Sequence, residues 1–186
     1  MHPYLTRYNQ RVLPKLTEAK SYVSSYCVPK VTKISLNVGL GDLLGNDKAI
    51  EQVTGLLVAI SGQKPVETKA RKAIAGFKIR QGMVIGLKVT LRGQRMYDFL
   101  MKLLEISLPR TRDFRGLRAS GITADGNLNI GIKDSIIFPE ASQDSTNHGI
   151  QITIVSTARS LQEARLLYES MGFVFQSEEE VVTKKR

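Results

Sequence analysis

The residue types that most often carry out catalysis are few in this chain and lie far apart. There are two histidines, His2 and His148, and a single cysteine, Cys27. No base lies near Cys27 in the sequence, so we expect a small buried side chain rather than a nucleophile. The carboxylates are scattered, without a pair placed for general acid and base chemistry. These observations argue against an enzyme, a structural metal site and a bound cofactor.

A glycine-rich turn is the one motif that suggests nucleotide binding. Gly39, Gly41 and Gly45 follow an alternating apolar segment. Their spacing is one residue longer than the dinucleotide fingerprint, and no Gly-Lys-Ser/Thr sequence completes a phosphate loop. We therefore interpret them as flexible turn glycines.

Positive charge is concentrated in the middle of the chain. The 186 residues include 27 Lys and Arg and 17 Asp and Glu, a net charge of +10. Between Ile60 and Arg118 there are fourteen bases and four acids, an excess of ten that equals the net charge of the whole protein. A positive field confined to one segment suits a polyanionic partner such as nucleic acid. A merely solvated charged surface and an anionic membrane are the alternatives, and no basic amphipathic helix supports the membrane.

Hydrophobic periodicity predicts both helices and strands. Apolar residues spaced by three and four predict helices over about 4–19, 47–61, 96–108 and 160–171. Apolar and polar residues alternate in four segments, as in strands with one buried face, and a fifth short strand is expected near 64–68. The four alternating segments are 33–38, 84–92, 127–132 and 150–154.

These elements predict an α+β fold in one domain over residues 1–186. We expect a two-layer sandwich, with a mainly antiparallel sheet, helices on one face and an open RNA-binding face on the other. Residues 1–20 would contain an N-terminal helix, which Pro14 either kinks or delays. Asp47 is the expected N-cap of the second helix and Gly62 its C-terminal stop. Ser160 and Glu163 form an expected capping box at the start of the last helix.

The open face would display short hydrogen-bonding side chains and a few bases, without acids. Such a surface suits the phosphates and sugar hydroxyls of folded RNA, and it lacks the aromatic residues on which unpaired bases stack. Duplex DNA is the second candidate, and any solvated sheet face would also be polar. The expected residues are Lys33, Ser35, Asn37, Lys88, Thr90, Arg92, Asn127, Asn129, Gln151 and Thr153.

Residues 69–82 form a basic segment without sustained periodicity. It is rich in small residues, and Ile74, Phe77 and Ile79 are isolated apolar positions. Long irregular loops in compact domains are usually functional, so we expect an extended basic loop rather than a disordered linker.

Several long motifs in this chain resemble those of one family, that of large-subunit ribosomal protein five, the bacterial 5S rRNA binder. The resemblance covers nearly the whole chain in order. The motifs are ISGQKP at 60–65, TKARK at 68–72, AGFKIRQG at 75–82, KVTLRG at 88–93, PRTRDFRGL at 109–117 and IFPE at 137–140.

The resemblance implies a structural protein of the large subunit that joins 5S rRNA to the central protuberance. It also implies contacts with 23S-type rRNA, with P-site tRNA through the long loop, and with a small-subunit head protein through an inter-subunit bridge. Neither a membrane nor a homo-oligomer is implied. Asn37, Gln63, Thr90 and Arg92 match the family's RNA-facing sheet positions. The expected 5S rRNA residues are these four together with Lys33, Ser35, Lys64 and Lys88. The implied tRNA or rRNA loop residues are Lys69, Arg71, Lys72, Phe77, Lys78 and Arg80, and the implied bridge or rRNA residues are Arg110, Arg112 and Arg115.

Two segments depart from the family pattern. The polar loop 142–148 lacks the bases that many members carry there, and the charged tail 177–186 runs beyond the usual end and is expected to be mobile. A single cysteine and no signal peptide favour a cytoplasmic ribosome, and the sequence leaves the organism and an organellar ribosome open.

Overall fold

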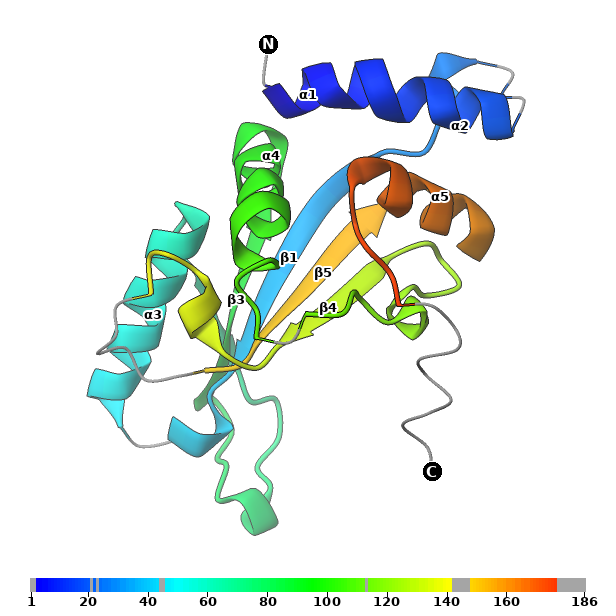
Figure 1. The fold of residues 1–186 in the computed structure, drawn as a ribbon. Coiled ribbons are helices and arrows are strands. Elements are labelled where there is room, and N and C mark those ends of the chain that lie inside the picture. Colours follow the sequence, from blue (N-terminus) through cyan, green and yellow to red (C-terminus); the bar gives the residue numbers. More distant parts are fainter. Residues whose placement is uncertain are drawn as a thin grey trace, which may run out of the picture. The chain divides into compact units, whose positions relative to one another are not determined.

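A computed structural model describes residues 3–20, 22, 24–43, 46–112, 114–141 and 148–176 of the chain. The strands form a five-stranded antiparallel sheet in the order β2-β3-β1-β5-β4 (Figure 1), so the predicted α+β fold is confirmed. Their bounds are β1 Val31–Gly39, β2 Val66–Lys69, β3 Val84–Leu91, β4 Leu128–Ile132 and β5 Ile150–Ser156. The tail 177–186 and residues 142–147 of the polar loop lie outside the described residues.

The chain divides into two compact units. The first comprises residues 1–34, 92–130 and 153–186, and the second comprises residues 35–91 and 131–152. The first therefore holds α4 (Gly93–Lys102) and α5 (Leu161–Met171), and the second holds α3 (Asp47–Ser61). No helix among the described residues is long and apolar enough to cross a membrane. Those residues also contain no cluster of His, Cys, Asp and Glu that could hold a metal ion.

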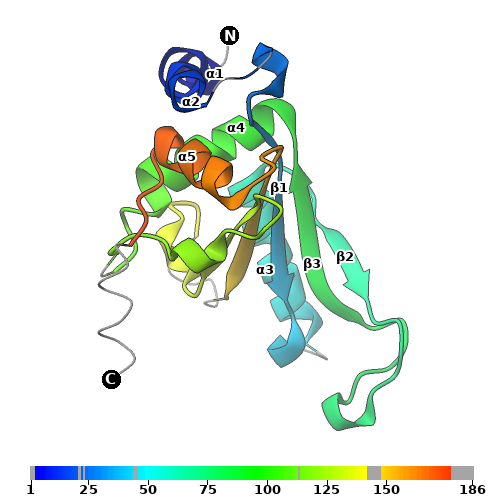
Figure 2. The ribbon, with the colours of Figure 1, turned by 90° about the vertical axis from the view of Figure 1, so that its right-hand side faces the viewer.

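In the first unit, the N-terminal helix runs from Pro3 to Ala19 as α1 (Pro3–Arg7), a π-helical turn (Tyr8–Val12) and α2 (Leu13–Ala19). The π turn lies just before Pro14, whose missing N–H and bulky ring would disrupt a regular α-helix. The π-helical turn packs on α5, and α1 packs on α4. Figure 2 shows α4 and α5 on the same side of β1 in this unit.

In the second unit, β2 and β3 form an antiparallel hairpin and α3 packs against β3. The N-cap of α3 is Asn46, whose side chain accepts a hydrogen bond from the Ala49 N–H at 3.2 Å. The prediction of Asp47 was therefore wrong by one residue, because the two adjacent acceptor side chains are equally suited to a cap. Gly62 ends the helix in the left-handed conformation, with φ 65°, as predicted.

Cys27 is exposed, so the prediction of a buried side chain was wrong. It ends a short 3₁₀ turn, Ser25–Cys27, and the buried apolar residue at this point of the chain is the next one, Val28.

Candidate nucleic-acid interface

The alternation along β1 and β3 separates a buried set of side chains from an accessible set in the second unit. Leu36, Val38, Leu87 and Val89 are buried in the core. The residues between them are accessible to different degrees. Asn37 and Lys88 are exposed, and Ser35 and Thr90 are half-buried. Because β1 and β3 are neighbours in the sheet, the structure brings these four predicted residues together on adjacent strands.

The edge strand β2 adds an apolar residue that the sequence reasoning missed. Val66 lies opposite Lys88 in the register, and its side chain is 67% exposed. Residues paired across antiparallel strands share a face, so Val66 belongs to the same surface as Lys88. No sequence signal marked it, because its exposure follows from the position of β2 at the edge of the sheet.

Gly86 lets this edge strand approach closely. Thr68 is its partner on β2, and a Cβ on Gly86 would lie 2.8 Å from the Thr68 Oγ1 and 3.0 Å from the Val38 carbonyl oxygen. Only glycine fits there without a shift of the neighbouring strands.

Gln63 and Lys64 follow α3 and are positioned by the helix end. The Ser61 hydroxyl accepts from the Gln63 N–H at 3.2 Å, and it contacts the Leu57 and Gln63 carbonyl oxygens at 2.6 and 3.0 Å. Gln63 is half-buried, whereas Lys64 is exposed. The buried serine therefore fixes the backbone from which both predicted side chains extend.

The segment between β2 and β3 continues their hairpin. The Ala70 N–H donates to Met83 at 2.8 Å, and Ile74 and Ile79 exchange backbone hydrogen bonds of 2.9 and 3.2 Å. The tip is a 3₁₀ turn, Ala75–Phe77, and Lys78 follows it in the left-handed conformation with φ 56°. Ordered backbone pairing was not predicted, because small residues and bases dominate and leave no apolar alternation.

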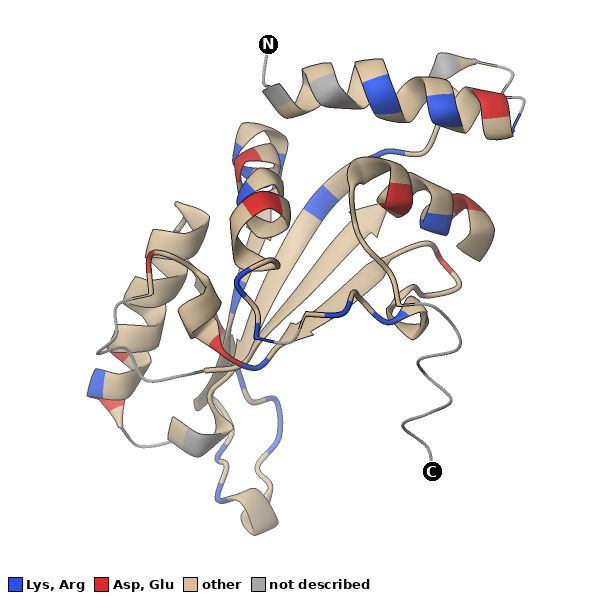
Figure 3. Cartoon of the chain, viewed as in Figure 1, with Lys and Arg blue, Asp and Glu red and all other residues tan. Residues whose placement is uncertain are grey.

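All the predicted bases of this hairpin are exposed. In the part of the chain that the structure describes, none of them makes an ion pair. Figure 3 shows Lys and Arg along both arms without Asp or Glu. Phe77 and Ile74, with 71% and 49% of their side chains exposed, add an apolar tip. The exposed bases are Lys69, Arg71, Lys72, Lys78 and Arg80.

In the first unit, Lys33 and Arg92 extend from the start of β1 and from the end of β3. Lys33 is half-buried between Thr32 and the buried Ile34. Arg92 is exposed, with an extended backbone (φ −141°, ψ 163°), and its side chain does not cap α4. It therefore continues the alternation of β3 for one residue beyond the strand, as the sequence predicted.

The basic loop after α4 is held by the C-terminal segment. The Leu117 N–H donates to Val174 at 2.7 Å, and the Gln176 N–H donates to Leu117 at 2.9 Å. Gly116, with φ 102°, permits this approach, because its Cβ would lie 3.0–3.1 Å from the backbone of residues 174–176. This pairing of distant segments carries no periodic signal and was missed. The three predicted bases of this loop are exposed: Arg110, Arg112 and Arg115.

Two family models match adjacent parts of this chain. "Ribosomal protein L5" matches residues 24–80, and "ribosomal L5P family C-terminus" matches residues 84–175. The large ribosomal subunit protein uL5 of Ralstonia pickettii (strain 12J) is 50% identical over 172 residues, covering 91% of this chain and 96% of that protein. The chain belongs to the ribosomal protein L5 family.

Relatives in other bacteria are equally similar to this L5 family member. The uL5 protein of Lactobacillus delbrueckii subsp. bulgaricus (strain ATCC BAA-365 / Lb-18) is 49% identical, covering 92% of this chain and 97% of that protein. That of Streptococcus pyogenes serotype M49 (strain NZ131) is 48% identical, covering 91% and 95%. The predicted family is thus confirmed. So is the prediction of a protein that is not an enzyme, since the L5 family is not enzymatic.

Proposed function

We propose that this L5 family member is a protein of the large ribosomal subunit that binds 5S rRNA and helps to attach it to the central protuberance. Its polar strand side chains and the adjoining bases would contact 5S rRNA. The β2–β3 hairpin would contact P-site tRNA and nearby 23S-type rRNA. The loop that carries Arg110, Arg112 and Arg115 would contact rRNA or the small-subunit head protein in an inter-subunit bridge.

The observation that carries this proposal is a set of exposed bases without acidic partners. Lys88 on β3 and the five hairpin bases lie on consecutive elements of one unit, and none of them pairs with an acid among the described residues. Unpaired cations repel one another in the isolated protein. Each can neutralise a phosphate and release a counterion when RNA binds.

The side chains beside these bases favour folded RNA over duplex DNA. Ser35, Asn37 and Thr90 offer short hydroxyl and amide groups on the sheet. The Asn37 side chain is exposed, and those of Ser35 and Thr90 are half-buried. The wide minor groove of an RNA helix presents 2′-hydroxyls that such groups recognise, whereas duplex DNA has none. Val66 adds an apolar contact for a sugar ring at the same edge.

The hairpin suits a second RNA, because most of its Lys and Arg side chains lie on the segment that continues past the ends of β2 and β3. Its backbone is paired at Ala70 and again at Ile74, so hydrogen bonds within the hairpin stabilise its shape. The exposed Phe77 can stack on a base or pack on a ribose at the tip.

Co-sedimentation tests the proposal. We expect the tagged protein to sediment with large ribosomal subunits and to be released together with 5S rRNA when the subunits are stripped at high salt. An Asn37→Ala, Arg92→Ala double variant should keep its melting temperature and bind 5S rRNA more weakly by a few kcal/mol, about one or two charge-assisted hydrogen bonds. Absence from large subunits, or unaltered affinity of the double variant, would contradict the proposal.

A further inference from the structure

Asn129 and Thr153 are joined side chain to side chain across two neighbouring strands of the first unit. The Thr153 hydroxyl donates to the Asn129 Oδ1 at 2.7 Å. The residues that flank them, Leu128, Ile130 and Ile152, are buried in the core. Since side chains alternate along a strand, this polar pair lies on the non-core face, where both residues are half-buried and accessible.

The hydrogen bond decides which half of the Asn129 amide remains available. Its oxygen is occupied by the Thr153 hydroxyl, while no described residue accepts from its Nδ2. A carboxamide nitrogen carries two N–H donors. Asn129 is therefore oriented to donate, and a ligand at this position must present an acceptor oxygen.

The surroundings favour an acceptor that carries negative charge. β1, β5 and β4 are consecutive in the sheet, and none of the three contains Asp or Glu. Lys33 on β1 is the only Lys or Arg within these three strands, and its alternation with the buried Ile34 puts it on the same face as Asn129. The Asn129 main chain is closely covered, since a Cβ on Gly121 would lie 2.7 Å from its carbonyl oxygen. The side chain is thus the part that can meet a ligand.

We propose that Asn129, oriented by Thr153, is an RNA-binding residue that donates its amide N–H to a phosphate or ribose oxygen of 5S rRNA. This inference rests on the proposed function and extends the contact to β4. It gives Thr153 the role of a positioning residue, because its hydroxyl is directed at Asn129 rather than at the RNA.

The test measures the affinity of the purified protein for 5S rRNA by filter binding, with melting temperatures measured in parallel. Asn129→Asp keeps the acceptor for Thr153 and replaces the donors by a carboxylate, so we expect affinity to fall at least about tenfold. Asn129→Ser shortens the side chain without adding charge and should lower affinity roughly 3- to 10-fold. The Asn129→Ser variant should leave the salt dependence unchanged, since no charge is lost.

Thr153→Val separates positioning from direct contact. Alone, it should lower affinity roughly 2- to 3-fold, because the amide loses its fixed orientation. Combined with Asn129→Ser, it should add nothing, since the group that it orients is gone. Additive effects of the two substitutions would contradict the positioning role of Thr153.

Gln162→Glu is the matched control, because it makes the same amide-to-carboxylate change on an exposed position of α5. We expect wild-type affinity from it. If the wild-type protein binds 5S rRNA and both Asn129 variants bind equally well with unchanged melting temperatures, the inference is overturned and the proposed function stands. If the wild-type protein does not bind 5S rRNA, both are overturned.

Discussion

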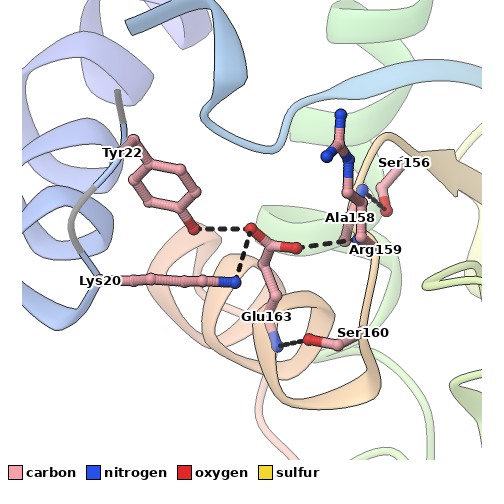
Figure 4. A network of polar contacts seen from close by, with 7 residues as sticks. All are labelled: Lys20, Tyr22, Ser156, Ala158, Arg159, Ser160 and Glu163. Carbon is pink, nitrogen blue, oxygen red and sulfur yellow. Dashed lines mark hydrogen bonds and ion pairs between the residues drawn. The ribbon is translucent and has the colours of Figure 1, made fainter. Parts of the chain in front are cut away.

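The Tyr22 hydroxyl donates a hydrogen bond of 2.8 Å to the Glu163 Oε1, joining residues 141 positions apart in the sequence. The other carboxylate oxygen, Oε2, accepts from the Arg159 N–H at 2.8 Å, and the Lys20 Nζ lies 3.9 Å from Oε1 (Figure 4). Glu163 is only 6% exposed. A buried carboxylate thus connects the segment after the N-terminal helix to the start of α5. Two neutral hydrogen-bond donors and the Lys20 ammonium stabilise its charge.

We predict that Glu163→Gln lowers the free energy of unfolding by about 1–3 kcal/mol, measured by urea denaturation at pH 7. The neutral amide weakens the hydrogen bonds to Tyr22 and Arg159 and places an N–H2 where an acceptor is needed. Glu169→Gln is the control, because Glu169 forms an exposed ion pair with Arg165 at 2.8 Å within one helix face. It should cost less than about 0.5 kcal/mol. Equal losses from both substitutions would contradict the role given to Glu163.

The same carboxylate should make stability depend on pH. Burial alone would raise the pKa of Glu163, but the Arg159 N–H, the Tyr22 hydroxyl and the Lys20 charge outweigh it and hold that pKa below its ordinary value of 4.5. A lowered folded-state pKa means that the stabilisation is complete above about pH 4.5 and is lost as the pH falls through the folded-state value. The stability difference between wild type and Glu163→Gln should therefore shrink below pH 4.5. A constant difference from pH 7 to pH 3 would contradict this prediction.

Hydrophobic periodicity predicted most of the helices and strands. The features that it did not predict depend on contacts between segments that are distant in the sequence. Alternation placed β1, β3, β4 and β5 within a few residues, because each has one buried face. The capping box was right in one half only: the Ser160 hydroxyl accepts from the Glu163 N–H at 3.3 Å, but the Glu163 carboxylate reaches Arg159, one residue further back. Its other partner, Tyr22, lies 141 positions away in the sequence, so no local pattern could predict this contact.

The candidate site was predictable where it follows strand alternation. Asn37, Lys88 and Thr90 could be placed on accessible strand positions because apolar residues flank each of them. Val66 could not, since its exposure depends on lying at the sheet edge, which is a property of strand order. The pairing of Leu117 with the C-terminal segment also depends on the tertiary fold. The assignment of each base to a particular RNA remains a prediction.

Gly86→Ala should destabilise the protein by about 1–3 kcal/mol, because the added methyl group would meet the Thr68 Oγ1 and the Val38 carbonyl oxygen at 2.8 and 3.0 Å. Gly131→Ala is the matched control, a strand glycine with open space at its Cβ position. It should be neutral or slightly stabilising. Thermal unfolding of the two variants compares them, and equal effects would show that β2 does not need this close approach.

Deleting Ile74 to Lys78 should preserve the fold and most of the 5S rRNA affinity, because Ala70 and Met83 close the hairpin below the deletion at 2.8 Å. Ribosomes that carry the deletion should release P-site tRNA faster. Phe77→Ala should do the same to a smaller extent without lowering the melting temperature, since the ring is exposed. Loss of 5S rRNA binding with unchanged tRNA dissociation would reverse the roles given to the hairpin and the strands.

The most direct test of RNA binding by this surface compares 5S rRNA with a DNA duplex of similar length in filter binding at increasing salt. We predict saturable binding that prefers 5S rRNA and weakens steeply with salt, with a slope of about −0.7 to −0.9 per neutralised phosphate. Lys88→Gln, which removes an exposed base from β3, should flatten that slope by about one unit. Equal binding of both nucleic acids, or an affinity independent of salt, would contradict a role in binding 5S rRNA.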